Sequence, residues 1–278
     1  MKRAPWIHIG IILFALLCGA GIIWSLVFSR GDAPVLVTDG LPSWRAKGSE
    51  DRSRNNSVPV LLYHNIDGAG GYSLDYEKLR AQFELLRTMG VHLVRLDTLV
   101  EHVALGKALP RKTVAISFDD DFFSFYEKLL PLAREFGYPV TLFVYTSQIF
   151  NRGDRNLTWK RLLEMERAGI SIQCHSATHP DLVRLLEKNT PESRQKLFEE
   201  IYLAKRKMEL YLGKEIRYFA FPYGRFTTTL AELCREAGFE RTFSTEDGTN
   251  IMTRNNFCLR RRHIKKDDSE ETVRAIVE

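Results

Sequence analysis

The stretch TVAISFDDDFFSFYEKLLPLAREFGYPVTLFVY, residues 113–145, decides the fold. An apolar run ends in three aspartates, a segment with helical spacing follows and stops at Gly137, and a second apolar run closes the stretch. Two short apolar runs joined by an amphipathic helix are typical of a unit with two parallel strands. We therefore predict strands at 113–118 and 140–145, with a helix at 122–136 between them.

The same alternation continues on both sides of this unit. Further strands are predicted at 58–63, 170–174, 216–221 and 239–244. Further helices are predicted at 75–89, at 159–168, at 190–212, before Ala237 and after Ser269. Strands that alternate with helices form a parallel sheet, so the fold class is α/β. About seven such units suit a (β/α) barrel, distorted or incomplete; a doubly wound open sheet is the alternative.

The N-terminal part differs in composition. Lys2 and Arg3 precede an uncharged, mostly apolar run from Ile7 to Phe28, which is long enough to cross a bilayer as a transmembrane helix. A cleaved signal peptide, with its shorter apolar region, is the alternative. Positive residues before the span predict that the rest of the chain lies outside the cytoplasm. The expected organisation is a membrane anchor at 1–30, a flexible linker at 31–57 and a folded domain at 58–278.

Charge and cysteine content exclude some classes of protein. The formal net charge of +5 is modest and no nucleic-acid-binding motif is present, so we interpret the basic excess as solvated surface and expect no nucleic-acid partner. Four scattered cysteines do not make a disulfide scaffold. Cys174 directly precedes His175, and we interpret it as a buried strand residue rather than a metal ligand.

Three carboxylates, Asp119, Asp120 and Asp121, follow the strand at 113–118. Adjacent like charges repel, and a cation would relieve that repulsion. Neighbours on a regular strand face opposite ways, so Asp119 and Asp120 can approach one site only where the strand ends, which is where they lie. The alternative is a helix cap, for which one aspartate would suffice.

Two imidazoles, His175 and His179, follow the strand at 170–174, and their separation by four residues suits a divalent metal. The C-terminal ends of the strands meet at one edge of a parallel barrel. We therefore predict that Asp120, His175 and His179 hold one divalent cation. Three protein ligands leave open positions, as catalysis needs. Asp119 beside the ion would be the base for a water that attacks a carbonyl.

A third motif, Pro222-Tyr223-Gly224, ends the strand at 216–221 and predicts a rigid turn, either structural or part of the site. In this order, the three motifs resemble those of the polysaccharide deacetylase family with the NodB homology domain. The resemblance covers Val58 to the C-terminus. The opening PVLLYH, residues 59–64, is similar to the exopolysaccharide deacetylase branch, which acts on poly-N-acetylglucosamine.

This resemblance implies a role for each motif. Asp119 would be the catalytic base, and Asp120, His175 and His179 would bind a metal that is usually zinc. The backbone N–H of Tyr223 would help to hold the oxyanion, and its ring would help to wall the substrate groove. The family's general acid is a late histidine, which implies His263.

Three positions depart from the family pattern. Asp121 stands where glycine is usual, and aspartate tolerates the positive φ that such a position can require. Ala220 stands where an arginine often tunes the base, so that arginine is missing or is supplied from elsewhere. Arg261 replaces the leucine usual two residues before the acid, which leaves His64 as a second candidate beside His263. The basic tract at 260–266 is interpreted as solvated, with contact to lipid phosphates as the alternative.

The sequence thus predicts a membrane-anchored, metal-dependent hydrolase that removes acetyl groups from N-acetylated polysaccharides outside the cytoplasm. A lipid-linked sugar and peptidoglycan are the alternative substrates. A catalytically inactive carbohydrate-binding homologue is the alternative from another class of protein.

Overall fold

A computed structural model describes residues 54–55, 57–149, 157–251 and 257–278. The predicted anchor at 1–30 and most of the predicted linker at 31–57 lie outside these residues. Within the described ranges, no helix is both long enough and apolar enough to cross a membrane.

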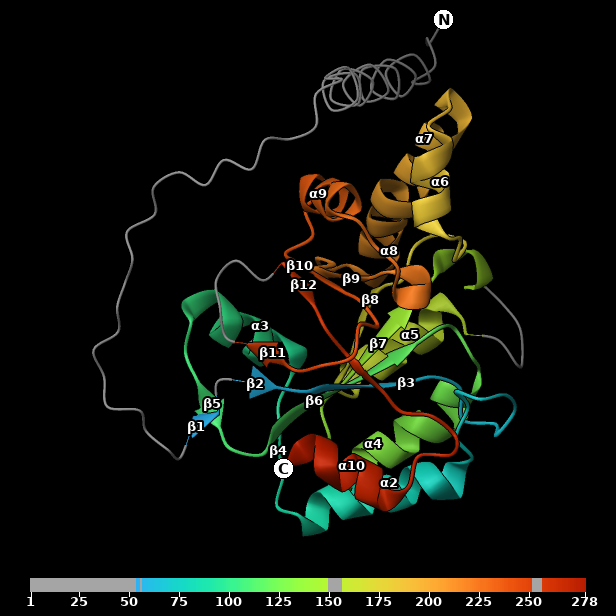
Figure 1. Ribbon diagram of the computed structural model, residues 1–278. Helices are drawn as coiled ribbons and strands as arrows, with labels where there is room; N and C mark the ends of the chain where they lie inside the picture. Colours follow the sequence, from blue (N-terminus) through green and yellow to red (C-terminus); the bar gives the residue numbers. More distant parts are fainter. Residues whose placement is uncertain (1–53, 56, 150–156, 252–256) are drawn as a thin grey trace, which may run out of the picture. The chain divides into compact units, whose positions relative to one another are not determined.

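The centre of the domain is a curled sheet whose main path has eight strands, each parallel to its neighbours (Figure 1). Their order is β12-β10-β9-β8-β7-β6-β3-β13. The strands are β3 (Val60–Tyr63), β6 (Thr113–Asp119), β7 (Val140–Val144), β8 (Ile170–Cys174), β9 (Tyr218–Ala220), β10 (Arg241–Phe243), β12 (Cys258–Leu259) and β13 (Arg262–His263). Strand β4 (His92–Leu93) pairs with β6 off this path. The predicted α/β class is confirmed, with one strand more in the path than the sequence indicated.

The two ends of the sheet are joined by one short segment. Strand β12 pairs with β10, and β13 pairs with β3 at the opposite end of the path. Only Arg260 and Arg261 separate β12 from β13 along the chain. The strands from β3 to β12 follow one another in chain order, without the reversal that defines a doubly wound sheet. The arrangement is therefore barrel-like, and residues 258–263 bridge its two ends.

Helices surround this sheet (Figure 1). They are α2 (Tyr76–Thr88), α3 (Leu96–Leu105), α4 (Leu130–Phe136), α5 (Trp159–Arg167), α6 (Leu182–Lys188), α7 (Pro191–Phe198), α8 (Ala204–Leu212), α9 (Thr228–Glu236) and α10 (Glu270–Val277). Two antiparallel pairs complete the described part: β1 (Arg54–Asn55) with β5 (Leu109–Pro110), and β2 (Ser57–Val58) with β11 (Asn250–Ile251).

Local sequence explains why the helices begin where they do. The side chains of Asp75, Thr158, Thr190, Thr227 and Ser269 each accept a hydrogen bond from a backbone N–H in the first turn of the following helix. Such caps satisfy donors that have no partner inside the helix. The caps at Asp75, Thr158, Thr190 and Ser269 agree with the predicted helix starts, whereas no start was predicted for the helix after Thr227.

The strands that carry the site are buried on both faces. All seven residues of β6 are buried, and so are all five of β7. Burial on both faces explains why these segments are mostly apolar rather than alternating. The charged side chains of this edge, such as Asp119, lie where the strands end.

Candidate metal and catalytic centre

The structure brings the three predicted metal ligands together. Asp120, His175 and His179 each offer one ligand atom, and these atoms lie within 4.8 Å of one another. The two Nε2 atoms are 3.1 Å apart, and Asp120 Oδ1 lies 3.6 Å from His179 Nε2 and 3.9 Å from His175 Nε2. Ligands about 2.0–2.1 Å from a tetrahedral zinc are about 3.3 Å from one another. The observed separations therefore fit a single small cation.

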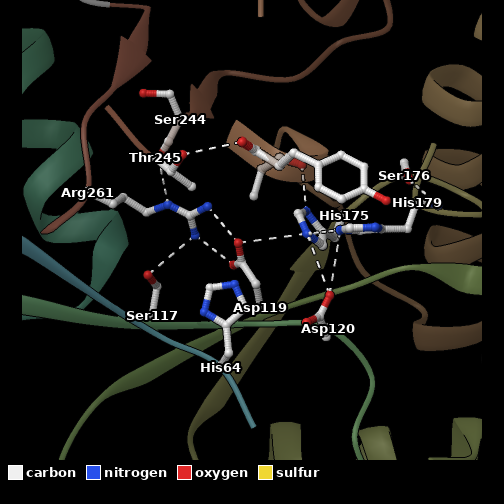
Figure 2. Close-up of polar contacts among 12 residues, drawn as sticks. His64, Ser117, Asp119, Asp120, His175, Ser176, His179, Ser244, Thr245 and Arg261 are labelled. Atoms are coloured by element: carbon white, nitrogen blue, oxygen red, sulfur yellow. Dashed lines mark hydrogen bonds and ion pairs between the residues drawn. The ribbon is translucent and has the colours of Figure 1, made fainter. Parts of the chain in front are cut away.

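The backbone sets the tautomer of His175. Its Nδ1 lies 2.8 Å from the carbonyl oxygen of Ala220, and a carbonyl can only accept. Nδ1 must therefore carry the proton, which leaves the Nε2 lone pair directed at the site (Figure 2). The ring is buried, and burial is the main reason that its pKa falls to about 4. His175 is therefore neutral near pH 7, as a metal ligand must be.

His179 is presented by a tight loop between the two histidines. Ser176 and His179 have φ angles of 78° and 58°, in the left-handed region that side chains usually avoid. The His179 N–H donates to Ser176 Oγ at 3.0 Å, which closes the loop. The His179 ring lies between Tyr145 and Tyr223, with centroid distances of 5.4 and 4.7 Å. Burial lowers the pKa of His179.

Asp120 is a half-buried carboxylate with an acidic residue on either side. Burial, followed by the charges of Asp119 and Asp121, raises its pKa to about 7. A divalent cation would reverse this effect by stabilising the ionised form. The left-handed conformation expected at Asp121 occurs at Asp120 instead, with φ 84°. Asp121 has no positive φ, so its departure from the family's glycine causes no backbone strain there.

Asp119 is held by a buried arginine. Arg261 donates from Nη1 to Oδ1 and from Nη2 to Oδ2, both at 2.6 Å (Figure 2). Its Nε donates to the carbonyl oxygen of Ser244 at 3.0 Å. Burial alone would raise the pKa of Asp119, but the charges of Arg261 and His175 outweigh it and hold the pKa at about 2. The carboxylate is therefore ionised at neutral pH and fixed in direction, 3.8 Å from His175 Nε2.

Arg261 decides between two alternatives that the sequence left open and corrects one interpretation. The arginine absent at Ala220 is supplied from the segment that joins the ends of the sheet. The basic tract at 260–266 is not simply solvated, since Arg261 is fully buried. Arg260 and Arg262 pair with Glu246 and Asp247. The only signal for this contact was the replacement of the family's leucine by arginine two residues before His263.

The two candidate acids form one pair. His263 Nε2 lies 3.1 Å from His64 Nδ1, and the rings are stacked with centroids 4.7 Å apart. The half-exposed ring of Tyr72 stacks on His263 at 4.2 Å. Burial is the main reason that the pKa of each histidine falls to about 4. The charge of Asp119 acts on the pKa of both histidines, so the pair lies near the proposed base.

The third motif lies beside His179. Tyr223 has φ 58° and is 61% exposed, and its ring makes an edge-to-face contact with the His179 ring. Gly224 has φ 66°, and a Cβ there would come within 2.0 Å of Thr245 Oγ1 and 2.4 Å of Thr245 N. The turn therefore needs glycine at this position to bring Tyr223 beside the metal ligands.

None of the cysteines in the described part of the chain belongs to this cluster. Cys174 is fully buried in β8, where burial raises the pKa of its thiol to about 12. Cys174, Cys234 and Cys258 are all free thiols. The interpretation of Cys174 as a packed strand residue is confirmed.

Comparisons with known proteins identify a family and a fold that this chain shares. Residues 106–242 match the family described as polysaccharide deacetylase. The chain is 24% identical over 245 residues to the poly-beta-1,6-N-acetyl-D-glucosamine N-deacetylase of Staphylococcus aureus, which covers 80% of this chain and 83% of that protein. The deacetylase PplD of Streptococcus pyogenes, solved with acetate, shares the fold with a TM-score of 0.70 and 23% identity over 80% of this chain and 98% of that one. IcaB from Ammonifex degensii has a TM-score of 0.69 and 24% identity over 81% of this chain and 98% of that one.

Proposed function

This chain belongs to the polysaccharide deacetylase family, and from that membership we propose that it is a metal-dependent hydrolase of acetamido groups on an N-acetylated polysaccharide. A polymer of N-acetylglucosamine is the proposed substrate, because the Staphylococcus aureus relative acts on one. The observation that carries the proposal is the convergence of an ionised, arginine-held Asp119 with the cluster of Asp120, His175 and His179.

The proposed cofactor is a zinc ion held by Asp120, His175 and His179. Two imidazole nitrogens and one carboxylate oxygen are a donor set that zinc enzymes use, with further positions left open. The ion would polarise the acetamido carbonyl and lower the pKa of water. Asp119 belongs to a separate hydrogen-bonded pair with Arg261, so it remains available for proton transfer.

The protein's own groups would then move the protons. Asp119 accepts a proton from the attacking water, since Arg261 keeps its carboxylate ionised at neutral pH. The pair of His64 and His263 is neutral near pH 7, since the pKa of each ring is about 4, so it would relay to the leaving amine the proton that Asp119 takes from water. The C–N bond then breaks, and acetate and a free amine result. The backbone N–H of Tyr223 would hold the oxyanion. Its exposed ring would wall the groove for the sugar chain.

The proposed location follows from the N-terminal sequence. An uncharged apolar run from Ile7 to Phe28 after Lys2 and Arg3 supports a membrane anchor with the enzyme outside the cytoplasm. Such an enzyme would meet exported polysaccharide. Membrane fractionation tests this part: full-length chain should remain with membranes after high-salt washing, whereas a chain lacking residues 1–30 should not.

The reaction is tested by measuring two products together. Purified protein with zinc is incubated with a panel of glycans: poly-β-1,6-N-acetylglucosamine, chitin oligomers and peptidoglycan. We expect equal amounts of acetate and new primary amine, most from the β-1,6 polymer. EDTA should stop the reaction, and added zinc should restore it.

Two outcomes would change the proposal. Release of acetate from peptidoglycan alone would replace the substrate and keep the reaction. Glycan binding without acetate release, under zinc, cobalt, nickel and manganese in turn, would overturn the enzyme and indicate a carbohydrate-binding protein.

A further inference from the structure

One buried carboxylate outside the catalytic centre has no role in the proposed reaction. Glu200 is fully buried. It belongs to a π-helical turn, Glu199–Leu203, which lies between α7 and α8. Burying a carboxylate is costly unless hydrogen bonds compensate it, and π turns occur frequently at functional sites. Both features call for an explanation in terms of the groups that Glu200 contacts.

Those groups belong to the loop between the two histidine ligands. Glu200 Oε2 accepts from the backbone N–H groups of Ala177 and Thr178 at 2.9 and 2.7 Å, and Oε1 accepts from Thr178 Oγ1 at 2.5 Å. Lys196 Nζ lies 3.0 Å from Oε1 and balances the charge. Three of the four donors therefore come from two consecutive residues of this loop.

The loop needs such support. Ser176 and His179 both have left-handed φ angles, which side-chain-bearing residues rarely adopt unless surrounding contacts hold them. His175 is anchored independently, at the end of β8 and by the carbonyl oxygen of Ala220. His179 does not directly follow a strand, so its position depends on the conformation of residues 176–178. The backbone N–H groups of Thr146 and Ser147 hold the carbonyl oxygens of Ser176 and Ala177. The N–H groups of Ala177 and Thr178 are held by Glu200.

We propose that Glu200 is a positioning residue for the metal centre, which holds the loop so that His179 Nε2 lies beside Asp120 and His175 before the metal arrives. A π turn contains more residues than a regular α-helical turn, so it changes the directions in which the side chains around it point. The π turn at Glu199–Leu203 thereby directs Glu200 toward the loop. This inference rests on the proposed metal centre, and it assigns Glu200 no contact with the substrate.

Zinc titration against a competing chelator tests it, with the melting temperature of metal-free protein measured in parallel. Glu200→Ala removes every acceptor and should raise the zinc Kd at least about tenfold, the scale found when groups that orient metal ligands are lost. Glu200→Gln keeps one oxygen for the two backbone N–H groups, so its Kd should lie between those of the wild type and Glu200→Ala. At saturating zinc, the kcat of Glu200→Gln should return to near the wild-type value.

The matched control is Glu199→Ala. Glu199 lies in the same π turn and also pairs with Lys196, at 3.6 Å, but it makes none of the loop contacts. Its zinc Kd should stay within about twofold of wild type. If Glu200→Ala does not fold, Glu200→Gln and Thr178→Val decide, and each should weaken zinc binding.

Two results would overturn the inference in distinguishable ways. The first result is a zinc Kd within twofold of wild type in the folded Glu200 and Thr178 variants, whatever their melting temperature. It would show that Glu200 supports the fold but not zinc binding, and the proposed enzymatic reaction would be unaffected. A wild-type chain that binds no zinc, cobalt or nickel would remove the metal centre itself.

Discussion

The pair of Asp119 and Arg261 is the residue-scale feature on which the chemistry depends. Both side chains are almost completely buried, and the two hydrogen bonds between them are short and parallel. A buried ion pair contributes little net stability compared with an apolar pair, but loss of one partner leaves an uncompensated charge. We therefore infer that the main role of Arg261 is to keep the Asp119 carboxylate ionised and fixed in orientation.

Asp119→Asn should separate catalysis from metal binding. The amide cannot accept the proton from water, so kcat should fall by about 100-fold or more. Asp119 is not among the three clustered ligands, so the zinc Kd should change by less than a few fold. Acetate release and zinc titration on the same preparation measure both. Activity that remained near the wild-type level would contradict the role of Asp119 as base.

Arg261→Met should leave Asp119 buried without its cation. We expect the free energy of unfolding to fall by about 3–5 kcal/mol. Asp119→Asn in the same chain should recover part of this loss, since the unpaired charge is then gone. Urea denaturation of the single and double variants, without metal, gives the coupling energy. Losses that add to within about 0.5 kcal/mol would show that the two residues act independently.

Asp120 should make the metal-free protein less stable as the pH rises. The pKa of Asp120 is about 7 in the folded protein, against an ordinary value of 3.8. Its contribution to stability is therefore full below about pH 4 and is lost as the pH rises through 7, because the folded protein keeps a proton that the unfolded chain has released. Asp120→Asn abolishes this loss, at the expense of a metal ligand.

Denaturation in EDTA at pH 5 and pH 8 measures this effect. The stability of Asp120→Asn relative to wild type should increase between these pH values, on the order of 3 kcal/mol. The comparison cancels the other titrating groups, which both proteins share. A difference that stays the same at the two pH values would contradict the raised pKa of Asp120.

At the scale of elements, the site depends on how each strand ends. The 3-10 turn at Pro222–Gly224 presents Tyr223 only because Gly224 permits both a positive φ and a close approach to Thr245. Gly137 at the end of α4 offers a matched comparison, since its φ is 65° and nothing lies within 4 Å of the place that an alanine methyl group would take. The two glycines thus differ in crowding rather than in backbone conformation.

Gly224→Ala should therefore be worse than Gly137→Ala. Both variants lose about 1 kcal/mol for placing alanine in the left-handed region. Gly224→Ala should lose about 1–3 kcal/mol more, because the methyl group collides with the Thr245 backbone, and kcat should fall as Tyr223 moves. Thermal unfolding and acetate release measure the two effects. Equal losses of stability in the two variants would show that crowding at Gly224 is relieved without cost.

Sequence patterns predicted most of these elements for local reasons. Apolar runs, capping residues and terminal glycines lie within the segments they define, as for Thr158 and Gly169 around α5. The helices α3 and α6 and the π turns at Phe125–Leu129 and Glu199–Leu203 were not predicted. The π turns depend on tertiary contacts, such as those of Glu200, that a local pattern does not contain.

At the scale of the molecule, the sheet brings distant segments to one edge. Asp119, His64 and His175 lie at or just beyond the C-terminal ends of β6, β3 and β8, so their convergence follows from parallel strands alone. The position of Arg261 does not follow from parallel strands alone. Arg261 and Asp119 are 142 residues apart in the sequence, and they meet because residues 258–263 bridge the two ends of the sheet. The convergence of Asp120, His175 and His179 could thus be predicted from the sequence, whereas the partner of Asp119 could not.

We propose that Asp120, His175 and His179 bind one divalent cation while Asp119 remains outside its coordination shell. The most direct measurement is a crystal structure of protein grown with zinc, with anomalous data collected at the zinc edge. We predict one peak about 2.0–2.2 Å from Asp120 Oδ1, His175 Nε2 and His179 Nε2, with Asp119 still paired to Arg261. A peak bound elsewhere, or one with Asp119 in the place of Asp120, would contradict the account.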